Sequence, residues 1–387
     1  MKNLTRVVAP LGLVALLAAC GSSSTNPTSS GSTAPSGSAS ASGGAGSACG
    51  TTVDEIAAAA KKEGQVNLIA LPDSWANYGG ILAAFRDTYG IKAPVANPDA
   101  SSADEVTAVK TLRGQPTMPD SVDVGPSFTS QLKEEKLVDV YKTTNWAEIP
   151  DNLKDPDGQW VASYYGVLSI GTNTKLVKNP PKTWADLKKP EYKGMVTING
   201  DPREAGAAFA AVMAAALANG GSFDDIMPGI QYYADLQASG NLQVIDVTPA
   251  AVLSGDVPIA LDWTYNFPGL KAELDEAGFT FETTVPTDGV YGGYYAQSVV
   301  SEAIHPCAAR LWLEHITGDA GALGYLKGGA VPARYDALLK AGKISEEMKA
   351  SLPTPEILAQ IKFPTKDQID AAKKVVVENW GKLVADK

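Results

Sequence analysis

The sequence predicts an α/β protein made of two lobes with a cleft between them. Short strand-like segments alternate with helical segments, which indicates sheets with mostly parallel strands. One such unit is interrupted by a second unit and is then resumed, which is the organisation of two lobes joined by crossing strands. The chain has 387 residues, which is long enough for two separate hydrophobic cores.

The first fifty residues predict export and a lipid anchor. Lys2 and Arg6 precede the apolar run 7–16, which is too short to span a bilayer stably. The motif Leu-Ala-Ala-Cys at 17–20 resembles a bacterial lipobox, so we expect a signal peptide over 1–19 and lipidation of Cys20. A plain secretory signal with an incidental cysteine is the alternative.

Residues 20–50 are expected to form a flexible linker that is anchored by the lipid. Only Gly, Ser, Thr, Ala, Pro and Asn occur between 21 and 48, and such a segment cannot bury apolar surface. The expected location of the folded body is therefore the outer face of the cytoplasmic membrane.

The composition of the chain indicates which ligands, disulfides and metals to expect. The formal net charge of −11 argues against nucleic acid and fits a cationic solute. Once Cys20 is lipidated, Cys49 and Cys307 remain, and an even pair outside the cytoplasm predicts a disulfide. The sequence has two histidines and no Cys-x-x-Cys motif, so we expect neither a metal nor a cofactor.

The first lobe is expected over residues 51–168 and again over 286–328. Pro72 closes its first strand, and Gly90 is placed to end its second helix. A long strand over 161–171 leaves this lobe. Its other expected elements are strands over 65–71, 91–95, 121–124 and 292–300 and helices over 52–62, 79–89, 103–112 and 308–316.

The second lobe is expected over residues 169–285, and residues 329–387 are expected to form helices that pack on the lobes. Ligands of such sheets bind beyond the carboxyl ends of the strands, which here places them between the lobes. The expected strands cover 194–198, 241–247, 258–263 and 279–285, and the expected helices cover 205–218, 225–238 and 249–254.

The segment Asp201-Pro-Arg-Glu204 stands between an expected strand and an expected helix, and it has two interpretations. Asp201 falls near the N-cap, Pro202 in the first turn and Glu204 three residues on, which resembles an acidic capping box. Alternatively, the two carboxylates face the cleft and bind a cationic ligand by charge-assisted hydrogen bonds. The two interpretations are compatible.

Seven short motifs follow one another along the chain. They are Leu71-Pro-Asp-Ser-Trp75-Ala-Asn-Tyr78, Val124-Gly-Pro-Ser127-Phe128, Thr183-Trp-Ala-Asp-Leu187, Pro190-Glu-Tyr-Lys-Gly194, Asp201-Pro-Arg-Glu204, Asp262-Trp263 and Ala303-Ile-His-Pro306. From Gln65 to the C-terminus this order resembles the extracellular solute-binding proteins of ABC importers, which have the type 2 periplasmic-binding-protein fold. Within that family the chain is most similar to the spermidine/putrescine-binding branch.

The resemblance implies an aromatic part of the ligand site. Trp75 and Tyr78 match an aromatic pair that flanks the methylenes of a polyamine. Ser127, which is followed by Phe128, matches a hydroxyl after the third strand of the first lobe. An ammonium over an aromatic face gains about 0.5–2 kcal/mol, so aromatic walls suit a polyamine.

The resemblance also implies an acidic part of the site. Asp201 and Glu204 match the acidic pair that holds an amine nitrogen, and Trp263 matches a tryptophan of the cleft. Relatives place an acid shortly after this tryptophan, whereas here an acid precedes it, and the two side chains would point to opposite faces of a strand. The remaining candidates for ligand contact are Asp262, Tyr265 and Tyr294.

By this resemblance the protein is not an enzyme but the extracytoplasmic solute-binding component of an ABC importer. It would bind a small cationic solute, above all a polyamine such as putrescine or spermidine. It would deliver this solute to a permease in the membrane, and we expect it to be a lipid-anchored monomer.

Several alternative functions stay open. Ferric-ion binders of the same fold use paired tyrosines, and the chain has such pairs at 164–165, 232–233 and 294–295. The pair at 232–233 lies inside an expected helix, which favours a packing role. Thiamine and aminophosphonate are further ligands of this fold class. A secreted hydrolase is the rival from another class, and the sequence lacks Gly-x-Ser-x-Gly, His-Glu-x-x-His and P-loop motifs, although its acidic pairs leave a glycosidase open.

Overall fold

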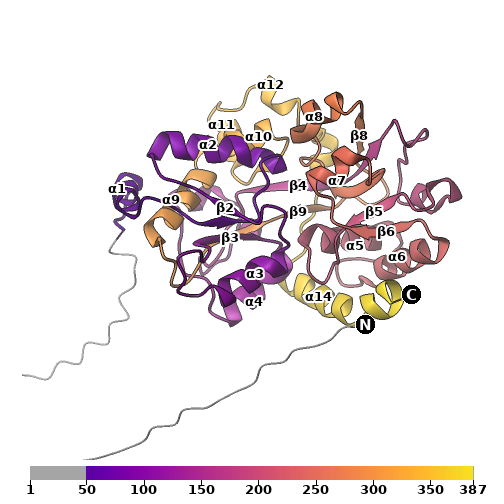
Figure 1. The fold of residues 1–387 in the computed structure, drawn as a ribbon, viewed down its shortest axis with the longest axis horizontal. Coiled ribbons are helices and arrows are strands. Elements are labelled where there is room, and N and C mark those ends of the chain that lie inside the picture. Colours follow the sequence, from indigo (N-terminus) through magenta and orange to yellow (C-terminus); the bar gives the residue numbers. More distant parts are fainter. Residues whose placement is uncertain (1–48, 387) are drawn as a thin grey trace, which may run out of the picture. The chain divides into compact units, whose positions relative to one another are not determined.

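The computed structural model describes residues 49–386, and most of their helices and strands are labelled in Figure 1. The predicted signal peptide, Cys20 and the predicted linker up to residue 48 lie outside the described residues. The sulfur atoms of Cys49 and Cys307 are bonded at 2.05 Å, so the predicted disulfide is confirmed. It joins residues 258 positions apart, and closing so long a loop stabilises a fold by up to about 5 kcal/mol through chain entropy.

The first lobe is built from short strands and the helices that pack on them. Its elements are α1 (Val53–Glu63), β1 (Leu68–Ile69), η1 (Trp75–Asn77), α2 (Tyr78–Tyr89), β2 (Val95–Ala96), α3 (Ser102–Thr111), β3 (Ser121–Val124), η2 (Pro126–Phe128), α4 (Thr129–Glu134), β10 (Ala296–Val299), α9 (Pro306–Thr317) and α10 (Asp319–Lys327). A capping box at Thr52 begins α1, and Gly90 ends α2 with a φ of 66°, a conformation that glycine adopts readily. β1 pairs with β2 in parallel, whereas β3 pairs with β10 antiparallel.

The second lobe is built around one larger sheet. Its elements are β4 (Tyr164–Asn173), β5 (Val196–Asn199), α5 (Gly206–Ala218), α6 (Met227–Ser239), β6 (Leu242–Ile245), α7 (Pro249–Ser254), β7 (Ile259–Trp263), η7 (Pro268–Leu270), α8 (Lys271–Glu276) and β8 (Phe281–Thr284). Together with β11 (Val331–Pro332) the strands lie in the order β11-β4-β7-β5-β6, and β8 and β9 (Gly292–Tyr294) also pair with β4.

β4 is the strand that crosses between the lobes. Its first part pairs with β9 in the register Tyr165↔Tyr294, and its second part pairs with β7 in the register Leu168↔Trp263. The expected strand 292–300 is divided into β9 and β10, because β9 pairs with β4 and β10 pairs with β3. The prediction of parallel pairing holds for β5 with β6 and β7, but all of the pairings of β4 are antiparallel.

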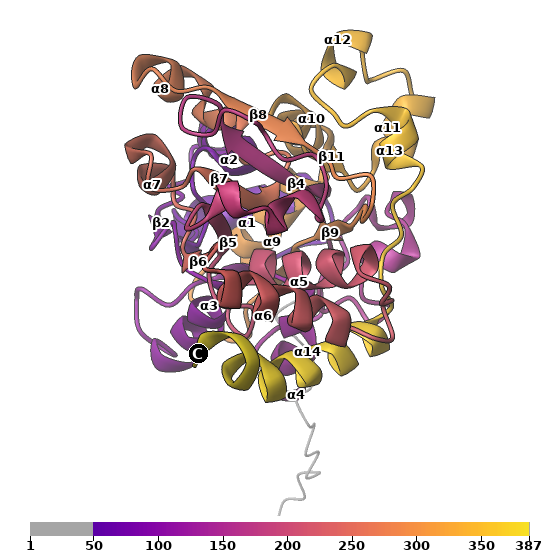
Figure 2. The ribbon, with the colours of Figure 1, turned by 90° about the vertical axis from the view of Figure 1, so that its right-hand side faces the viewer.

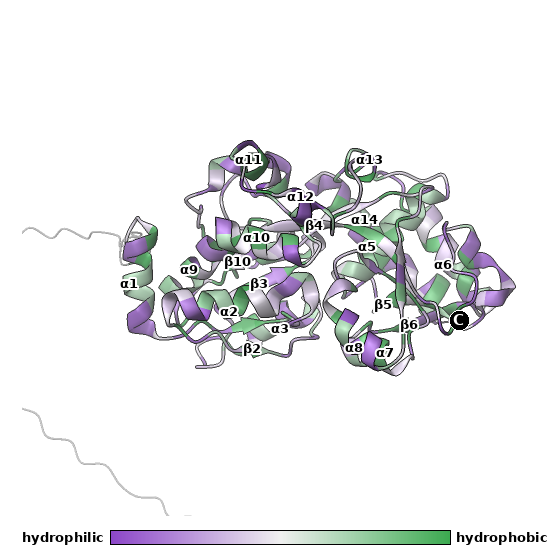
Figure 3. Cartoon of the chain, turned by 90° about the horizontal axis from the view of Figure 1, so that it is seen from above, coloured by the Kyte–Doolittle hydropathy of each residue, from purple (hydrophilic) through white to green (hydrophobic). Residues whose placement is uncertain are grey.

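Burial follows the composition of each helix. α5 is buried from Gly206 to Ala216, because its residues are small or apolar on every side. α1 buries only Ile56 and Ala60, and Figure 3 shows hydrophilic and hydrophobic segments alternating along it. Among residues 49–386, no helix combines the length and the apolar character that crossing a membrane requires.

The segment predicted to be helical, 329–387, begins with the short strand β11 and continues as helices. They are α11 (Tyr335–Lys340), α12 (Glu346–Lys349), α13 (Pro355–Leu358), α14 (Lys366–Trp380) and the final turn η8 (Gly381–Ala385). A capping box at Thr365 begins α14. Figure 2 shows α14 along the edge formed by α5 and α6, and it also packs on η2 of the first lobe.

Candidate functional site

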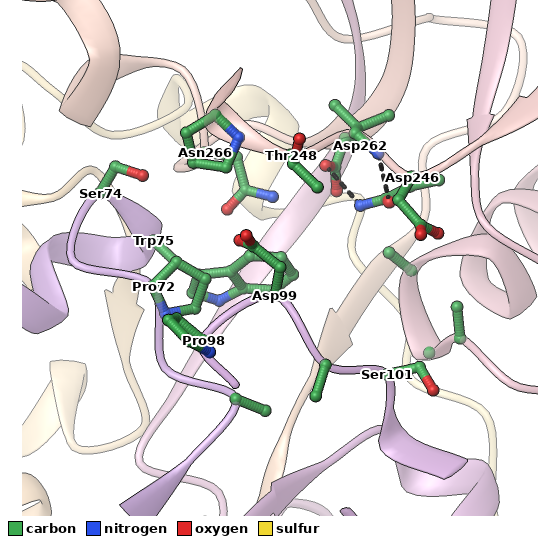
Figure 4. A pocket seen from close by; sticks show the side chains of 18 of the residues that line it. Pro72, Ser74, Trp75, Pro98, Asp99, Ser101, Asp246, Thr248, Asp262 and Asn266 are labelled. Atoms are coloured by element: carbon green, nitrogen blue, oxygen red, sulfur yellow. Dashed lines mark hydrogen bonds between the residues drawn. The ribbon is translucent and has the colours of Figure 1, made fainter. Parts of the chain in front are cut away.

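A pocket of about 100 Å³ lies between the lobes. Figure 4 shows Trp75 and Asp99 on its first-lobe side, facing Thr248, Asp262 and Asn266 of the second lobe. The segments that follow the parallel strands β1, β2, β5 and β6 all contribute to its walls. The pocket therefore lies where ligands of open α/β sheets bind, beyond the carboxyl ends of the strands.

The charged side chains that line this pocket are all acidic. Five carboxylates contribute to the lining, and none of the lining residues is a lysine, an arginine or a histidine. Asp99 and Asp246 are exposed at its mouth, one from each lobe, and the other three are buried. The buried three are Glu105, Asp123 and Asp262.

Asp262 is a buried carboxylate on the second-lobe side. One of its oxygens accepts a hydrogen bond from Asn199 Nδ2 at 3.0 Å, and the other accepts one from the backbone N–H of Trp263 at 2.8 Å. Burial raises the pKa of Asp262 to about 6, although these donors favour the charged form. At neutral pH the carboxylate is therefore mostly ionised, with hydrogen-bond donors around it and no basic side chain in the pocket lining.

The first-lobe side of the pocket is held by a network around Asp123. Its carboxylate accepts hydrogen bonds from the hydroxyl of Tyr78 at 2.7 Å, from the hydroxyl of Tyr164 at 3.4 Å and from the amide of Gln297. Burial raises its pKa to about 7. Glu105 accepts the backbone N–H of Asp123 at 2.8 Å, and burial raises the pKa of Glu105 as well.

The two mouth carboxylates come from segments that directly follow strands. Asp99 lies just after β2, and Asp246 is the first residue after β6. Partial burial and the nearby charge of Asp246 raise the pKa of Asp99. A cation between the lobes would remove this unfavourable interaction.

Trp75 forms the aromatic wall of the pocket. Its indole N–H donates to the hydroxyl of Tyr164 at 2.8 Å, and its ring meets the ring of Tyr295 edge-on at 5.4 Å between centroids. The next two residues, Ala76 and Asn77, have positive φ values of 47° and 65°. Such conformations are rare for residues other than glycine and occur where the surroundings enforce them, often at ligand sites.

Trp75 and Asp262 are the two predicted site residues that line the pocket. Tyr78 is buried behind it and acts through Asp123. Trp263 and Tyr265 are also buried, with their rings stacked at 6.0 Å, and the indole N–H of Trp263 points to the hydroxyl of Tyr295 at 3.4 Å. These three aromatic residues support the walls rather than forming them.

Ser127, Phe128 and Tyr294 lie away from the pocket. Tyr294 is stacked on Trp160 at 5.5 Å, which is a packing contact. Phe128 lies beneath the ammonium group of Lys373 at 4.0 Å, and the hydroxyl of Ser127 is buried beside it in η2. None of these three predicted site residues therefore lines the pocket.

Asp201 and Glu204 also lie outside the pocket lining. The prediction of an N-cap at Asp201 is wrong, because α5 begins at Gly206 with Ala205 as its N-cap. The Asp201 carboxylate instead accepts the backbone N–H of Arg203 at 2.8 Å and the Arg203 Nε at 2.9 Å. A local turn with its own ion pair replaces the expected capping box.

Sequence reasoning missed most of the acidic lining. Asp99, Glu105, Asp123 and Asp246 are not among the predicted site residues, nor is Asn199 at the end of β5. The position of three of these residues at or just beyond the end of a parallel strand is the signal that could have found them. Asp123 lies within β3, and its side chain gives no such signal.

None of the three tyrosine pairs lines the pocket with both of its members. Tyr232 and Tyr233 are buried in α6, with the Tyr232 hydroxyl donating to the carbonyl of Trp184 at 2.7 Å, so the packing role predicted for them is confirmed. Tyr295 is the one tyrosine that lines the pocket. Within residues 49–386 no three or more His, Cys, Asp or Glu side chains are grouped so that they could hold a metal ion.

Two α/β lobes with a pocket between them are the architecture of the type 2 periplasmic-binding-protein fold, as predicted. Residues 118–370 match the family described as bacterial extracellular solute-binding proteins, which is more than half of the chain. The chain therefore belongs to this family, whose members are binding proteins.

Two curated relatives support this assignment over part of the chain. An uncharacterized protein from Haemophilus influenzae is 33% identical over 141 residues, which are 33% of this chain and 39% of that protein. The spermidine/putrescine-binding periplasmic protein of Escherichia coli K12 is 30% identical over 142 residues, covering 34% of this chain and 40% of that protein. The chain thus spans about two fifths of the length of these relatives.

Solved structures match over most of the chain at low identity, so they support the fold alone. The periplasmic binding protein AfuA from Actinobacillus pleuropneumoniae, with exogenous fructose-6-phosphate bound, has a TM-score of 0.66 at 18% identity and covers 83% of this chain and 99% of its own. Iron-bound HitA from Pseudomonas aeruginosa has a TM-score of 0.61 at 19% identity, with 82% and 99% coverage. The spermidine/putrescine-binding protein PotD from Streptococcus pneumoniae has a TM-score of 0.55 at 15% identity, with 81% and 99% coverage.

Proposed function

We propose that this protein binds a small organic cation, most specifically a polyamine such as putrescine or spermidine, and delivers it to an ABC permease. One observation carries the proposal: five acidic side chains and no basic side chain line the pocket between the lobes. Taking carboxylates out of water costs free energy unless a counter-charge is supplied. Here the chain supplies none within the pocket lining, so the ligand would supply it.

The distribution of charge suits a molecule with more than one ammonium group. Asp99 and Asp246 mark the mouth, and Asp262 marks the buried end. The indole of Trp75 lines the first-lobe side of the pocket, where it would contact the methylenes of a diamine or an ammonium group. A ligand of this kind would be held by charge at its nitrogen atoms and by apolar contact along its methylenes.

The same observation argues against the ligands of other proteins with this fold. A sugar phosphate needs cationic or N–H-rich surroundings, and the lining carboxylates would repel its phosphate. Ferric ion bound by tyrosine pairs needs two phenolates in the pocket, and Tyr295 alone lines it. The cationic solute is therefore the best supported of the alternatives.

The test is calorimetric titration of the full chain with putrescine, spermidine, ferric citrate and fructose-6-phosphate. We expect saturable binding of a polyamine and no heat from the sugar phosphate. A ligand at one hundred times its Kd should also stabilise the protein by about 2.7 kcal/mol in a thermal melt. Binding of the sugar phosphate or of iron, with no binding of either polyamine, would contradict the proposal.

We also propose that Cys20 carries the lipid that holds the protein at the membrane. The motif at 17–20 and the family's extracellular character support this. Substitution of Cys20 by alanine should release the protein into the soluble fraction with its disulfide and fold intact. Wild-type protein that is recovered soluble, with an unmodified cysteine at position 20, would contradict the anchor.

A further inference from the structure

The C-terminal helix α14 touches both lobes through a single lysine. Lys373 Nζ donates to the carbonyl oxygen of Arg203 in the second lobe at 2.6 Å. The same ammonium lies 4.0 Å from the centroid of the Phe128 ring in the first lobe. Burial lowers the pKa of Lys373 to about 8, while Asp201 and Glu204 act in the opposite direction.

Other contacts of α14 are also divided between the lobes. The carboxylate of Asp370 accepts a hydrogen bond from the hydroxyl of Ser130 in the first lobe at 2.8 Å. Gln368 Nε2 donates to Asp224 of the second lobe at 3.0 Å, and Trp380 is buried against α6. The helix is therefore fixed to each lobe at more than one point.

The lobes meet directly beside this helix, along a seam where their backbones are in contact. The N–H of Ala103 in the first lobe donates to the carbonyl oxygen of Glu204 in the second lobe at 3.2 Å. A Cβ atom added to Gly125 would lie 2.8 Å from the Cα atom of Gly206 across the seam. A rotation that separates the lobes would break these contacts and would pull the partners of Lys373 apart.

We propose that α14 is a clasp across the seam, and that Lys373 sets the ratio of closed to open molecules before any solute binds. An ammonium that is shared by Arg203 and Phe128 stabilises the arrangement in which the two lobes are together. The apparent affinity for a solute depends on the fraction of molecules that are in the binding-competent conformation. Because the clasp changes this fraction, it would regulate the solute site without touching it. This consequence for affinity rests on the proposed function, whereas the clasp itself does not.

The experiment measures the distance between the lobes in the full chain without solute. Lys92 and Ala250, two exposed positions on opposite lobes, are each replaced by p-acetylphenylalanine, which carries the spin label. This chemistry avoids the native cysteines. Pulsed EPR then compares wild type with Lys373→Met. The matched control is Lys374→Met, because Lys374 is the exposed neighbour on the same helix and loses the same charge.

We expect Lys373→Met to lower the ratio of closed to open molecules by about five-fold or more, since a desolvated ammonium–ring contact and a hydrogen bond are lost. Lys374→Met should give the wild-type distances. Lys373→Arg should also give the wild-type distances, because it keeps the positive charge at position 373. Identical distance distributions for wild type, Lys373→Met and Lys374→Met would overturn the clasp.

A second variant keeps the test decisive if Lys373→Met does not fold. Ser130→Ala removes the contact of Asp370 with the first lobe and leaves Lys373 in place. It should shift the distances in the same direction by a smaller amount, and an unchanged distribution would then overturn the clasp. A chain that binds no polyamine but opens in these variants would contradict the proposed ligand and still support the clasp.

Discussion

Two groups of carboxylates lie on either side of the start of α5, and they differ in the source of their counter-charge. On the seam side, Asp201 is paired with Arg203 of its own turn, and Glu204 lies near Lys373. On the pocket side, Asp262 has amide donors, and the pocket lining contains no basic residue. Among residues 49–386, the first group has basic side chains beside it, whereas the second group has hydrogen-bond donors but no basic side chain in the pocket lining.

This difference separates a structural role from a binding role more clearly than the sequence motif does. A carboxylate that has a cation from its own chain needs no ligand to offset its charge. A buried carboxylate without one keeps an unfavourable charge that a cationic solute would relieve. The comparison therefore moves the expected ligand contacts from Asp201 and Glu204 to the acidic lining of the pocket.

The largest expected effect is on Asp262. Asp262→Asn should weaken polyamine binding by about 2–5 kcal/mol, which is about thirty-fold or more, because a buried charge partner is lost. Asp201→Asn removes the same charge in the same lobe and is the matched control. Calorimetric titration with putrescine measures both variants, and equal affinities for the two would remove the distinction between the two groups.

The second prediction concerns pH. Burial raises the pKa of Asp262 to about 6 and that of Asp123 to about 7, so protons compete with a cationic solute below neutral pH. The Kd for putrescine should rise by about four-fold or more between pH 8 and pH 5.5, as Asp262 is protonated. Titrations in several buffers measure this, and a Kd that is constant over the range would contradict it.

The same shifts predict how the stability of the ligand-free protein depends on pH. Both aspartates bind a proton more tightly in the folded chain than in the unfolded chain, whose pKa is near 3.9. Their contribution to the free energy of unfolding therefore falls as the pH rises from about 4 to 7. Denaturant melts at pH 5 and pH 8 measure this. The free energy of unfolding should decrease less between pH 5 and pH 8 in Asp262→Asn than in wild type.

Much of the fold could be predicted because local patterns decide it. The strand β3 and the helix α7 have the predicted bounds, and Gly90 ends α2 as expected. The pairing partners could not be predicted in the same way, since β9 and β10 form one continuous segment in the sequence but belong to different sheets. Which sheet a residue joins depends on contacts that are distant along the chain.

The site could be predicted as a place but only in part as a set of residues. Trp75 was found because a large aromatic residue between a strand and a helix is poorly explained by packing. Asp201 does not cap α5, because its carboxylate is held in a local turn by Arg203, two residues away. Asp246 and Asp99 come together only when the two lobes are assembled, so no local pattern contains them both.

A smaller effect on polyamine affinity is expected when the hydrogen bond that orients Trp75 is removed. Tyr164→Phe removes the hydroxyl that accepts the indole N–H of Trp75 at 2.8 Å. The indole would then be less firmly oriented, and polyamine affinity should fall by about 1 kcal/mol, or about five-fold. Tyr165→Phe is the control, because the adjacent Tyr165 contacts Phe363 through its ring. Equal affinities in both variants would show that the hydroxyl of Tyr164 has no role in binding.

The smallest effect on affinity is expected at the segment that the sequence singled out. Asp201→Asn and Glu204→Gln should each leave the calorimetric Kd for putrescine within about two-fold of wild type, because neither side chain lines the pocket. Asp201→Asn loses a partly exposed ion pair with Arg203, so a denaturant melt should show a loss of about 0–1 kcal/mol in stability. Asparagine keeps an oxygen that accepts the backbone N–H of Arg203, which limits this loss. A large loss of affinity in either variant, with the fold intact, would mean that this carboxylate contacts the ligand. It would contradict the assignment of the ligand contacts to the acidic lining of the pocket.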